Sequence, residues 1–303
     1  KAASIHRKAI KMQDFNFNII NTIKDANPKR ANLLNIWHDD IEVEFGEATP
    51  KSGELAFDSI KKACDALKNN EIDVLVTAPI NKASIQKKAS NFIGHTEFLQ
   101  GNFEGESLMI MVSDIMKIAF VTGHIALENV KTAITSEKII TTTQQLNHSL
   151  ITDFGIRKPK IALIGLNPHA GEDGILGSEE KKIITPAIKK LKEDGVLTFG
   201  PYPADSFFTA RNLSAFDGIV SMYHDQGLTP FKTLSFSDGV NYTAGLNIVR
   251  TSPVHGTAAE IAGKGEANEQ SFREAVFMAC DIFKKRAEFK EINNNPLSFK
   301  TRK

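Results

Sequence analysis

Residues 161–169 read Ile161-Ala162-Leu163-Ile164-Gly165-Leu166-Asn167-Pro168-His169. Four consecutive apolar residues are typical of a buried parallel strand, and the polar run with Gly and Pro that follows is typical of a loop. The same order of a short apolar run and a polar loop recurs at residues 72–79, 118–124, 219–227 and 247–256. Strands of this kind predict a sheet that is largely parallel.

Helical periodicity separates these strands. Four helices are predicted, over residues 54–69, 137–150, 178–193 and 257–288. Ser52 is the predicted cap of the first helix. The third helix is expected to begin after Ser178, with Glu179 and Glu180 in its first turn, and Pro186 predicts an interruption in it. The alternation of strands and helices predicts an α/β protein with a mixed, mostly parallel sheet.

Length and composition exclude several classes of protein. A chain of 303 residues is long enough for about two domains. Lysine and arginine number 37 against 36 aspartate and glutamate, so binding of nucleic acid through bulk positive charge is excluded. No apolar run approaches the roughly 18 residues of a membrane span. Two distant cysteines, Cys64 and Cys280, favour a reducing compartment, and we expect a cytoplasmic protein.

Histidines occur at the ends of the predicted strands. Of the eight, four directly follow a β-rich run beside Gly or Pro: His124, His169, His224 and His255. Ligands of open α/β sheets bind at the carboxyl ends of the strands, and neutral imidazole is the commonest metal ligand. A lone histidine after a strand is usually a loop residue, but several in equivalent places predict a shared site. Three others lack this setting and are expected to be surface or core residues: His6, His38 and His148.

Other polar residues lie in the same loops. Asp205 follows a Gly-Pro-Tyr-Pro run and Asp225 follows His224. Either carboxylate could act as a general base or orient a histidine, and the alternative is a turn aspartate that bonds its own backbone. Side chains suited to an anionic substrate occur at Lys232, Asn241 and Arg250, with a solvated surface role as their alternative.

The chain offers no glycine-rich dinucleotide motif of the usual kind, since no Gly-x-Gly-x-x-Gly follows a predicted strand. His255-Gly256-Thr257-Ala258 is a different candidate. We expect it to form a glycine turn that opens the last helix, with backbone N–H groups free to receive an anion or a cofactor.

Two runs are highly specific: Asn-Pro-His-Ala-Gly-Glu at residues 167–172 and His-Asp-Gln-Gly at residues 224–227. Further characteristic segments lie at residues 76–82, 94–99, 203–206 and 250–252. Together they resemble the 4-hydroxythreonine-4-phosphate dehydrogenase family of pyridoxal 5'-phosphate biosynthesis, over residues 53–283.

The resemblance implies oxidation of 4-phosphooxy-L-threonine at C3 to 2-amino-3-oxo-4-phosphooxybutanoate, which decarboxylates to 3-amino-2-oxopropyl phosphate. It implies a divalent metal, zinc before magnesium, cobalt or manganese, held by His124, His169 and His224. It implies substrate contacts from His95, Thr96, Lys232, Asn241 and Arg250. The candidate bases remain Asp205 and Asp225.

The fold implied is that of the isocitrate and isopropylmalate dehydrogenases, with two α/β/α domains flanking a cleft. The first domain is expected to contain residues 1–93 plus 237–303, and the second residues 94–236. Residues 253–265 resemble the adenosine-binding loop of those relatives, which implies binding of NAD, with NADP as the alternative, by His255, Gly256, Thr257 and Ala258. The expected partners are a second copy of the chain, sharing the active site, and a small phosphorylated substrate, without nucleic acid or membrane.

The chain departs from the family pattern in two places. The family opens with a strand and a glycine-rich loop that this sequence lacks, so we expect its first segment to be missing. Val254 stands where many members carry Asp, which affects one polar contact near the cofactor. Three other functions stay open: a dehydrogenase of a related acid such as 4-phospho-threonate or 4-phospho-erythronate, a coenzyme A-dependent phosphate acyltransferase, and a non-catalytic phosphometabolite-binding protein.

Overall fold

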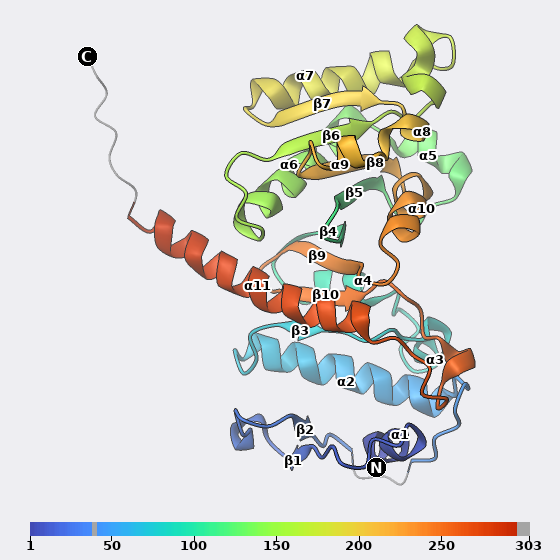
Figure 1. Cartoon of the computed structure of the whole chain (residues 1–303), viewed down its shortest axis with the longest axis vertical. Coiled ribbons are helices and arrows are strands. Elements are labelled where there is room, and N and C mark those ends of the chain that lie inside the picture. The colour runs from blue at the N-terminus through green and yellow to red at the C-terminus, as the bar shows by residue number, and fades with distance from the viewer. Residues whose placement is uncertain (38–40, 296–303) are drawn as a thin grey trace. The chain divides into compact units, whose positions relative to one another are not determined.

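The structure is a computed structural model that describes residues 1–37 and 41–295 (Figure 1). Its contacts divide the chain into two compact units. Unit 1 contains residues 1–73, 79–102 and 255–269, and unit 2 contains residues 74–78, 103–254 and 270 onward. The predicted α/β class with a mixed, mostly parallel sheet is confirmed. The division into residues 1–93 plus 237–303 and 94–236 stays a prediction. His38 lies outside the described residues.

Unit 1 centres on helix α2 (Pro50–Lys68). Its other elements are α1 (Ala2–Ala9), the parallel strands β1 (Asn18–Ile20) and β2 (Asn32–Leu34), the short turns η1 (Ile23–Asp25) and η4 (Ala259–Ile261), α3 (Lys82–Gln86) and α4 (His95–Gln100). The predicted helix over 54–69 is confirmed, but Ser52 as its cap is wrong. Thr49 is the cap, because its hydroxyl accepts the Ser52 N–H at 3.1 Å and Pro50 suits the first helical position.

Unit 2 is an eight-stranded sheet in the order β3-β10-β9-β4-β5-β8-β6-β7. The strands are β3 (Leu75–Val76), β4 (Gly105–Val112), β5 (Lys117–Thr122), β6 (Lys160–Ile164), β7 (Leu197–Tyr202), β8 (Gly218–Tyr223), β9 (Val240–Leu246) and β10 (Arg250–Pro253). β5, β8, β6 and β7 are mutually parallel, so their carboxyl ends lie at one edge of the sheet. The predicted strands at 118–121, 161–164 and 219–222 are confirmed in this group.

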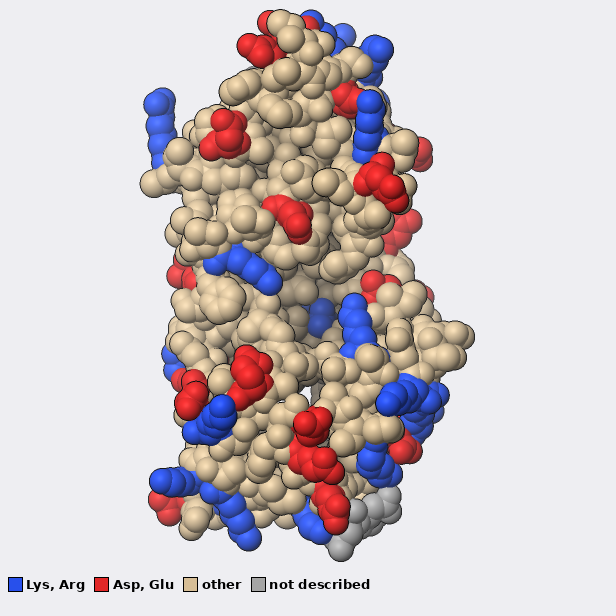
Figure 2. Space-filling model, turned by 90° about the vertical axis from the view of Figure 1, so that its right-hand side faces the viewer, with Lys and Arg blue, Asp and Glu red and all other residues tan. Residues whose placement is uncertain are grey.

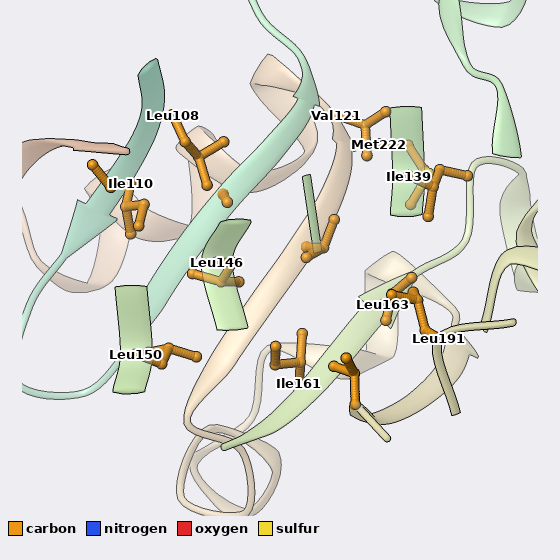
Figure 3. Packing of buried hydrophobic residues seen from close by; sticks show 14 of the residues in the cluster. Leu108, Ile110, Val121, Ile139, Leu146, Leu150, Ile161, Leu163, Leu191 and Met222 are labelled. Carbon is orange, nitrogen blue, oxygen red and sulfur yellow. The ribbon is translucent and has the colours of Figure 1, made fainter. Parts of the chain in front are cut away.

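Apolar side chains alternate between two buried clusters because successive strand residues face opposite sides of a sheet. Ile110 and Val121 belong to a cluster with helices α5 (Leu127–Ala133), α6 (Ser136–Thr152), α7 (Thr185–Glu193) and α11 (Gln270–Asn293). Figure 3 shows Ile139, Leu146 and Leu150 of α6 among the residues of this cluster. The neighbouring strand residues Met111 and Phe120 belong to the other cluster, with α8 (Ala204–Phe207), α9 (Ala210–Leu213) and α10 (His224–Leu234).

A buried ion pair fastens α11 to the sheet. The Asp153 carboxylate, 3% exposed, accepts hydrogen bonds from Arg286 Nε at 2.7 Å and from the Tyr242 hydroxyl at 2.7 Å. Arg286 also donates to the carbonyl oxygens of Leu246 and Ile248, at 3.0 and 2.9 Å. Burial, and then the negative charge of Asp153, raises the pKa of Tyr242 well above its ordinary value, so its hydroxyl stays a donor.

Three predicted elements differ from the structure. The last helix begins at Gln270 and not at 257, because Gly263 and Gly265 turn the chain with φ of 78° and 74°. The helix predicted over 178–193 runs continuously from residue 179 to residue 193, but its first part, η3 (Glu180–Ile184), is π-helical, and Pro186 lies in the first turn of α7 where it needs no N–H partner. The strand predicted at 247–250 is wrong, because residues 247–249 connect β9 to β10.

The surface carries interspersed charges of both signs on the face that Figure 2 draws. This pattern matches the near-zero net charge of the sequence. Among the described residues, no helix is both long and apolar enough to cross a membrane.

Candidate functional site

Three neighbouring strands end beside the histidines that the sequence predicts as metal ligands. β8 lies between β5 and β6 and runs parallel to both. His224 is the first residue of α10, directly after β8, and His124 lies two residues beyond β5. His169 lies in turn η2 (Pro168–Gly174), which follows β6. The sheet therefore directs all three loops to the same edge.

The structure brings two of these imidazoles together. The ring centroids of His124 and His224 are 4.9 Å apart, and Phe120 lies beside His224 at 5.9 Å. His224 Nδ1 lies 2.6 Å from Asp225 Oδ1, and since a carboxylate only accepts, Nδ1 is the donor of this contact; in a neutral imidazole Nε2 then keeps its lone pair. No group of three or more His, Cys, Asp or Glu side chains that could hold a metal ion occurs within residues 1–37 and 41–295, so His169 does not join the pair within one chain.

Side-chain hydrogen bonds tie the three strand ends to one another. The Thr122 hydroxyl at the end of β5 donates to the Met222 carbonyl of β8 at 2.8 Å. Gln226, 9% exposed in the first turn of α10, accepts the Met222 N–H at 2.7 Å and donates to the Gly165 carbonyl after β6 at 2.6 Å. The sequence did not indicate that either side chain positions the strand ends, although Gln226 lies inside the characteristic His-Asp-Gln-Gly run at residues 224–227.

The turn that carries His169 has a left-handed backbone. Residues 169–173 have φ between 40° and 82°, and four of the five are not glycine. The left-handed conformation costs a non-glycine residue roughly 1–2 kcal/mol. Such strain persists only where the surrounding structure determines it, and it concentrates at functional sites.

Two acidic side chains support this turn. Glu180 accepts the N–H groups of Leu166 and Asn167 at 2.8 and 2.7 Å. The Asn167 amide donates to Glu179 and Glu180, both at 2.9 Å. Glu179 also pairs with Lys131 at 3.1 Å. The Asn167 hydrogen bond, a bond to its own backbone N–H and the Lys131 bond lower the pKa of Glu179 to about 2.

We expect Glu179→Gln to lose stability near neutral pH and to lose its difference from the wild type in acid. Since the folded pKa lies below the ordinary 4.5, the ionised carboxylate stabilises the protein above that value. The contribution is roughly 3 kcal/mol, and it disappears as the pH falls from about 4.5 toward 2. Urea unfolding of both proteins at pH 6 and pH 3 measures this. A difference in unfolding free energy that is as large at pH 3 as at pH 6 contradicts the assignment.

A second polar group lies on β9 and β10. Arg250, 3% exposed, donates to the hydroxyls of Thr77, at 2.6 and 3.1 Å, and of Thr243, at 3.1 Å. Asn241 shares the sheet face of Thr243, two residues along β9. Its buried Oδ1 has no hydrogen-bond partner among the described residues. A buried amide oxygen without a hydrogen-bond partner is suited to accept a hydrogen bond from a ligand.

Asn241 and the histidines lie at different levels of the sheet. Asn241 is opposite Met111, and Met111 is opposite Ile118 near the amino end of β5. The carboxyl end of β5, before His124, is four residues further, or about 13 Å. Lys232, exposed on α10, lies eight residues beyond His224, or about 12 Å along the helix axis.

The remaining predicted site residues lie at helix starts. Asp205 is exposed in the first turn of α8, which follows β7 at the histidine edge of the sheet, and Asp225 is exposed in the first turn of α10. In unit 1, His95 and Thr96 are the first two residues of α4, and the His95 ring lies 6.4 Å from Phe92.

The predicted cofactor loop does not open a helix, and that expectation is wrong. His255 and Gly256 are followed by Thr257, by Ala258 with φ of 50°, and by the single turn η4. Thr257 instead lines a cavity of about 380 Å³ within unit 1. The same cavity is lined by Thr49 and Asn81, the capping residues of α2 and α3.

Sequence comparison finds close relatives over most of the chain. The family model described as pyridoxal phosphate biosynthetic protein PdxA matches residues 1–279. A 4-hydroxythreonine-4-phosphate dehydrogenase of Bacteroides thetaiotaomicron is 47% identical over 300 residues, which cover 98% of this chain and 82% of the relative. A protein of Oceanobacillus iheyensis that carries the name of a D-threonate 4-phosphate dehydrogenase is 40% identical over 243 residues, covering 80% of this chain and 73% of the relative.

Structural comparison agrees. The crystal structure of 4-hydroxythreonine-4-phosphate dehydrogenase from Klebsiella pneumoniae superposes with a TM-score of 0.76 at 32% sequence identity. The match covers 91% of this chain and 86% of that one.

Proposed function

Because the chain belongs to the family of the pyridoxal phosphate biosynthetic protein PdxA, we propose that it is the dehydrogenase that oxidises 4-phosphooxy-L-threonine at C3. The product, 2-amino-3-oxo-4-phosphooxybutanoate, is a β-keto acid that loses CO2 to give 3-amino-2-oxopropyl phosphate. Beyond family membership, the observation that carries the proposal is the imidazole pair of His124 and His224 at neighbouring strand ends.

We assign His124, His169 and His224 to a divalent metal, zinc first, with magnesium, cobalt or manganese as alternatives. Two of the three donors fit directly, since the rings of His124 and His224 lie 4.9 Å apart and, in a neutral imidazole, the Asp225 contact leaves His224 Nε2 available. His169 is assigned from the family pattern, since its turn follows the neighbouring strand β6 at the same sheet edge. When bound, such a metal lowers the pKa of a coordinated hydroxyl and polarises a carbonyl oxygen.

This chain's own residues bind the substrate and move its proton. Lys232, Asn241 and Arg250 help to hold the phosphate and the carboxylate through charge-assisted hydrogen bonds, and Thr77 and Thr243 fix the Arg250 guanidinium for that role. His95 and Thr96 supply further substrate contacts from the first turn of α4. The hydroxyl proton passes to the carboxylate of Asp205 or Asp225. NAD, when bound, would supply the acceptor for the hydride of C3.

The two levels of the sheet support a homodimer with a shared active site. A four-carbon phosphorylated acid cannot reach from the histidine edge to Asn241 of the same chain across about 13 Å of β5. A second copy of the chain completes the site when its Lys232, Asn241 and Arg250 lie beside the histidines of the first copy. Closed two-fold symmetry then gives two equivalent sites in each dimer.

The unit 1 cavity supports binding of NAD, with NADP as the alternative. Thr257 and Ala259 line it beside the amino ends of α2 and α3, whose backbone N–H groups and dipoles favour an anion. His255, Gly256 and Ala258 complete the loop that we assign to the adenosine half of the cofactor.

Both cysteines, Cys64 and Cys280, are free thiols. Free thiols fit the reducing environment of the cytoplasm, which we propose as the location of the protein.

The test is NADH formation from 4-phosphooxy-L-threonine and NAD, measured by absorbance before and after removal of metal by a chelator. We expect turnover that stops on chelation and returns when zinc is added. Turnover that is unaffected by thorough chelation contradicts the metal assignment.

A second candidate function is oxidation of 4-phospho-D-threonate or the related erythronate, favoured by the similarity to the Oceanobacillus protein. That acid carries a hydroxyl in place of the amino group. Comparison of kcat/KM for the two substrates at equal zinc separates the candidates. Turnover of neither substrate, by protein that binds zinc, contradicts both.

A further inference from the structure

The carboxylate of Glu180 lies buried against the turn that carries His169. Glu180 is 4% exposed and begins the π-helical turn η3, eleven residues beyond His169. A Cβ atom at Gly171, inside the left-handed run, would come within 2.6 Å of Glu180 Oε2. The carboxylate therefore packs directly on the backbone of the turn.

Among the described residues, the side-chain hydrogen bonds of Glu180 go to the segment that leads into His169. Oε1 accepts the N–H groups of Leu166 and Asn167, and Oε2 accepts the side-chain amide of Asn167. Three donors converge on two oxygens, so an ionised carboxylate, which only accepts, satisfies them all. A glutamine at this position would set its own N–H2 group against at least one donor.

The backbone conformation of the turn shows why these hydrogen bonds are needed. His169, Ala170, Glu172 and Asp173 all have φ near 50°, a conformation that these residue types avoid in isolation. Contacts outside the turn must therefore hold it. Because the Cα–Cβ direction follows from the backbone, the same contacts fix the direction in which the His169 imidazole leaves the chain.

We propose that Glu180 is a positioning residue for His169: its buried carboxylate holds the left-handed turn 169–173, the backbone from which His169 would reach the metal. The inference rests on the proposed metal role of His169. It assigns Glu180 no contact with substrate or metal.

The experiment measures zinc affinity by competition with a chromophoric chelator, in the full chain, for the wild type, Glu180→Gln and Glu172→Gln. Glu172→Gln is the matched control, because it removes the same charge from an exposed side chain three residues after His169. We expect Glu180→Gln to raise the zinc Kd at least about tenfold. The control is expected to change it by less than about twofold.

A second readout does not involve metal. Amide hydrogen exchange of the metal-free chain is expected to speed up over residues 166–174 in Glu180→Gln, while the amides of β5, β6 and β8 keep their protection. Adding Ala170→Gly to Glu180→Gln is expected to recover part of the zinc affinity, because glycine adopts a positive φ without strain.

The outcomes separate this inference from the proposed function. If the wild type binds zinc, and Glu180→Gln has the same zinc Kd and the same amide exchange rates as the wild type, the role of Glu180 is overturned. A wild type that does not bind zinc contradicts the metal assignment, and exchange over residues 166–174 then still decides whether Glu180 holds the turn. If Glu180→Gln does not fold, Asn167→Ala, which removes one of the three donors, decides: unchanged exchange and zinc affinity overturn the inference.

Discussion

The variants His124→Ala and His224→Ala are each expected to lose at least about 1,000-fold in kcat/KM. A bound metal supplies several kcal/mol of transition-state stabilisation, and about 4 kcal/mol corresponds to a factor of a thousand. Each variant removes one ring of the pair whose centroids are 4.9 Å apart. The measurement is NADH formation together with zinc content after dialysis, and both are expected to fall in the same variant.

The matched control is His148→Ala, because His148 is exposed on α6, outside the strand-end loops. It is expected to keep wild-type turnover and zinc content. Retention of zinc and activity by His124→Ala or His224→Ala would sink the metal assignment.

Mixing variants extends the same prediction to the shared site. Neither His224→Ala nor Lys232→Ala is expected to be active alone. When equal amounts of the two variants are refolded together, half of the dimers contain one chain of each variant. In such a dimer, one of the two sites combines the native His224 of one chain with the native Lys232 of the other. About a quarter of wild-type activity is therefore expected to return. A mixture as inactive as its components contradicts a site built from two chains.

The second large effect is on stability. Arg286→Met is expected to lower the free energy of unfolding by about 3–5 kcal/mol, because it leaves the Asp153 carboxylate buried without its cationic partner. It also removes the donors to the Leu246 and Ile248 carbonyls, which anchor α11 at the end of β9. Urea unfolding followed by circular dichroism measures the change.

Lys285→Met is the control for this prediction. Its ammonium pairs with Glu288 at 2.8 Å on the exposed side of α11, and such pairs contribute at most about 1 kcal/mol. The double variant Asp153→Asn/Arg286→Met is expected to lose less than the sum of the two single losses, since it removes both charges together. Additive losses, or a loss from Arg286→Met no larger than that of the control, contradict the buried ion pair as the anchor of α11.

The strands beside the site could be predicted because a buried parallel strand is a short continuous apolar run. Helix α10 could not, since Gly227 and Pro230 lie inside it and both disfavour helix. The structure explains the glycine: a Cβ there would come within 2.6 Å of Ile118 Cδ1 and Ser221 Oγ. Close packing of α10 on the sheet thus overrides the local preference.

The conformation of the turn around His169 also could not be predicted from the local sequence. Nothing in the types of Ala170, Glu172 or Asp173 indicates a left-handed turn. Glu179 and Glu180 do begin a helical segment, as their position predicted, but their carboxylates bond the loop before His169. The grouping of Asn241 with Arg250 depends on the pairing of β9 with β10, which no periodicity within either segment specifies.

The pairing of β3 with β10 has a consequence for synthesis of the chain. Residues 75 and 76, which lie between two segments of unit 1, become an edge strand of unit 2 only when residues 250 and 251 arrive. At about 5–20 residues per second, a ribosome needs roughly 10–35 s to bridge that interval. During this time the nascent chain holds an apolar segment, Val74-Leu75-Val76, whose backbone has no strand partner. Chaperone binding to the emerging polypeptide is therefore expected to concentrate on this segment, and to end only after residues 250 and 251 have been synthesised.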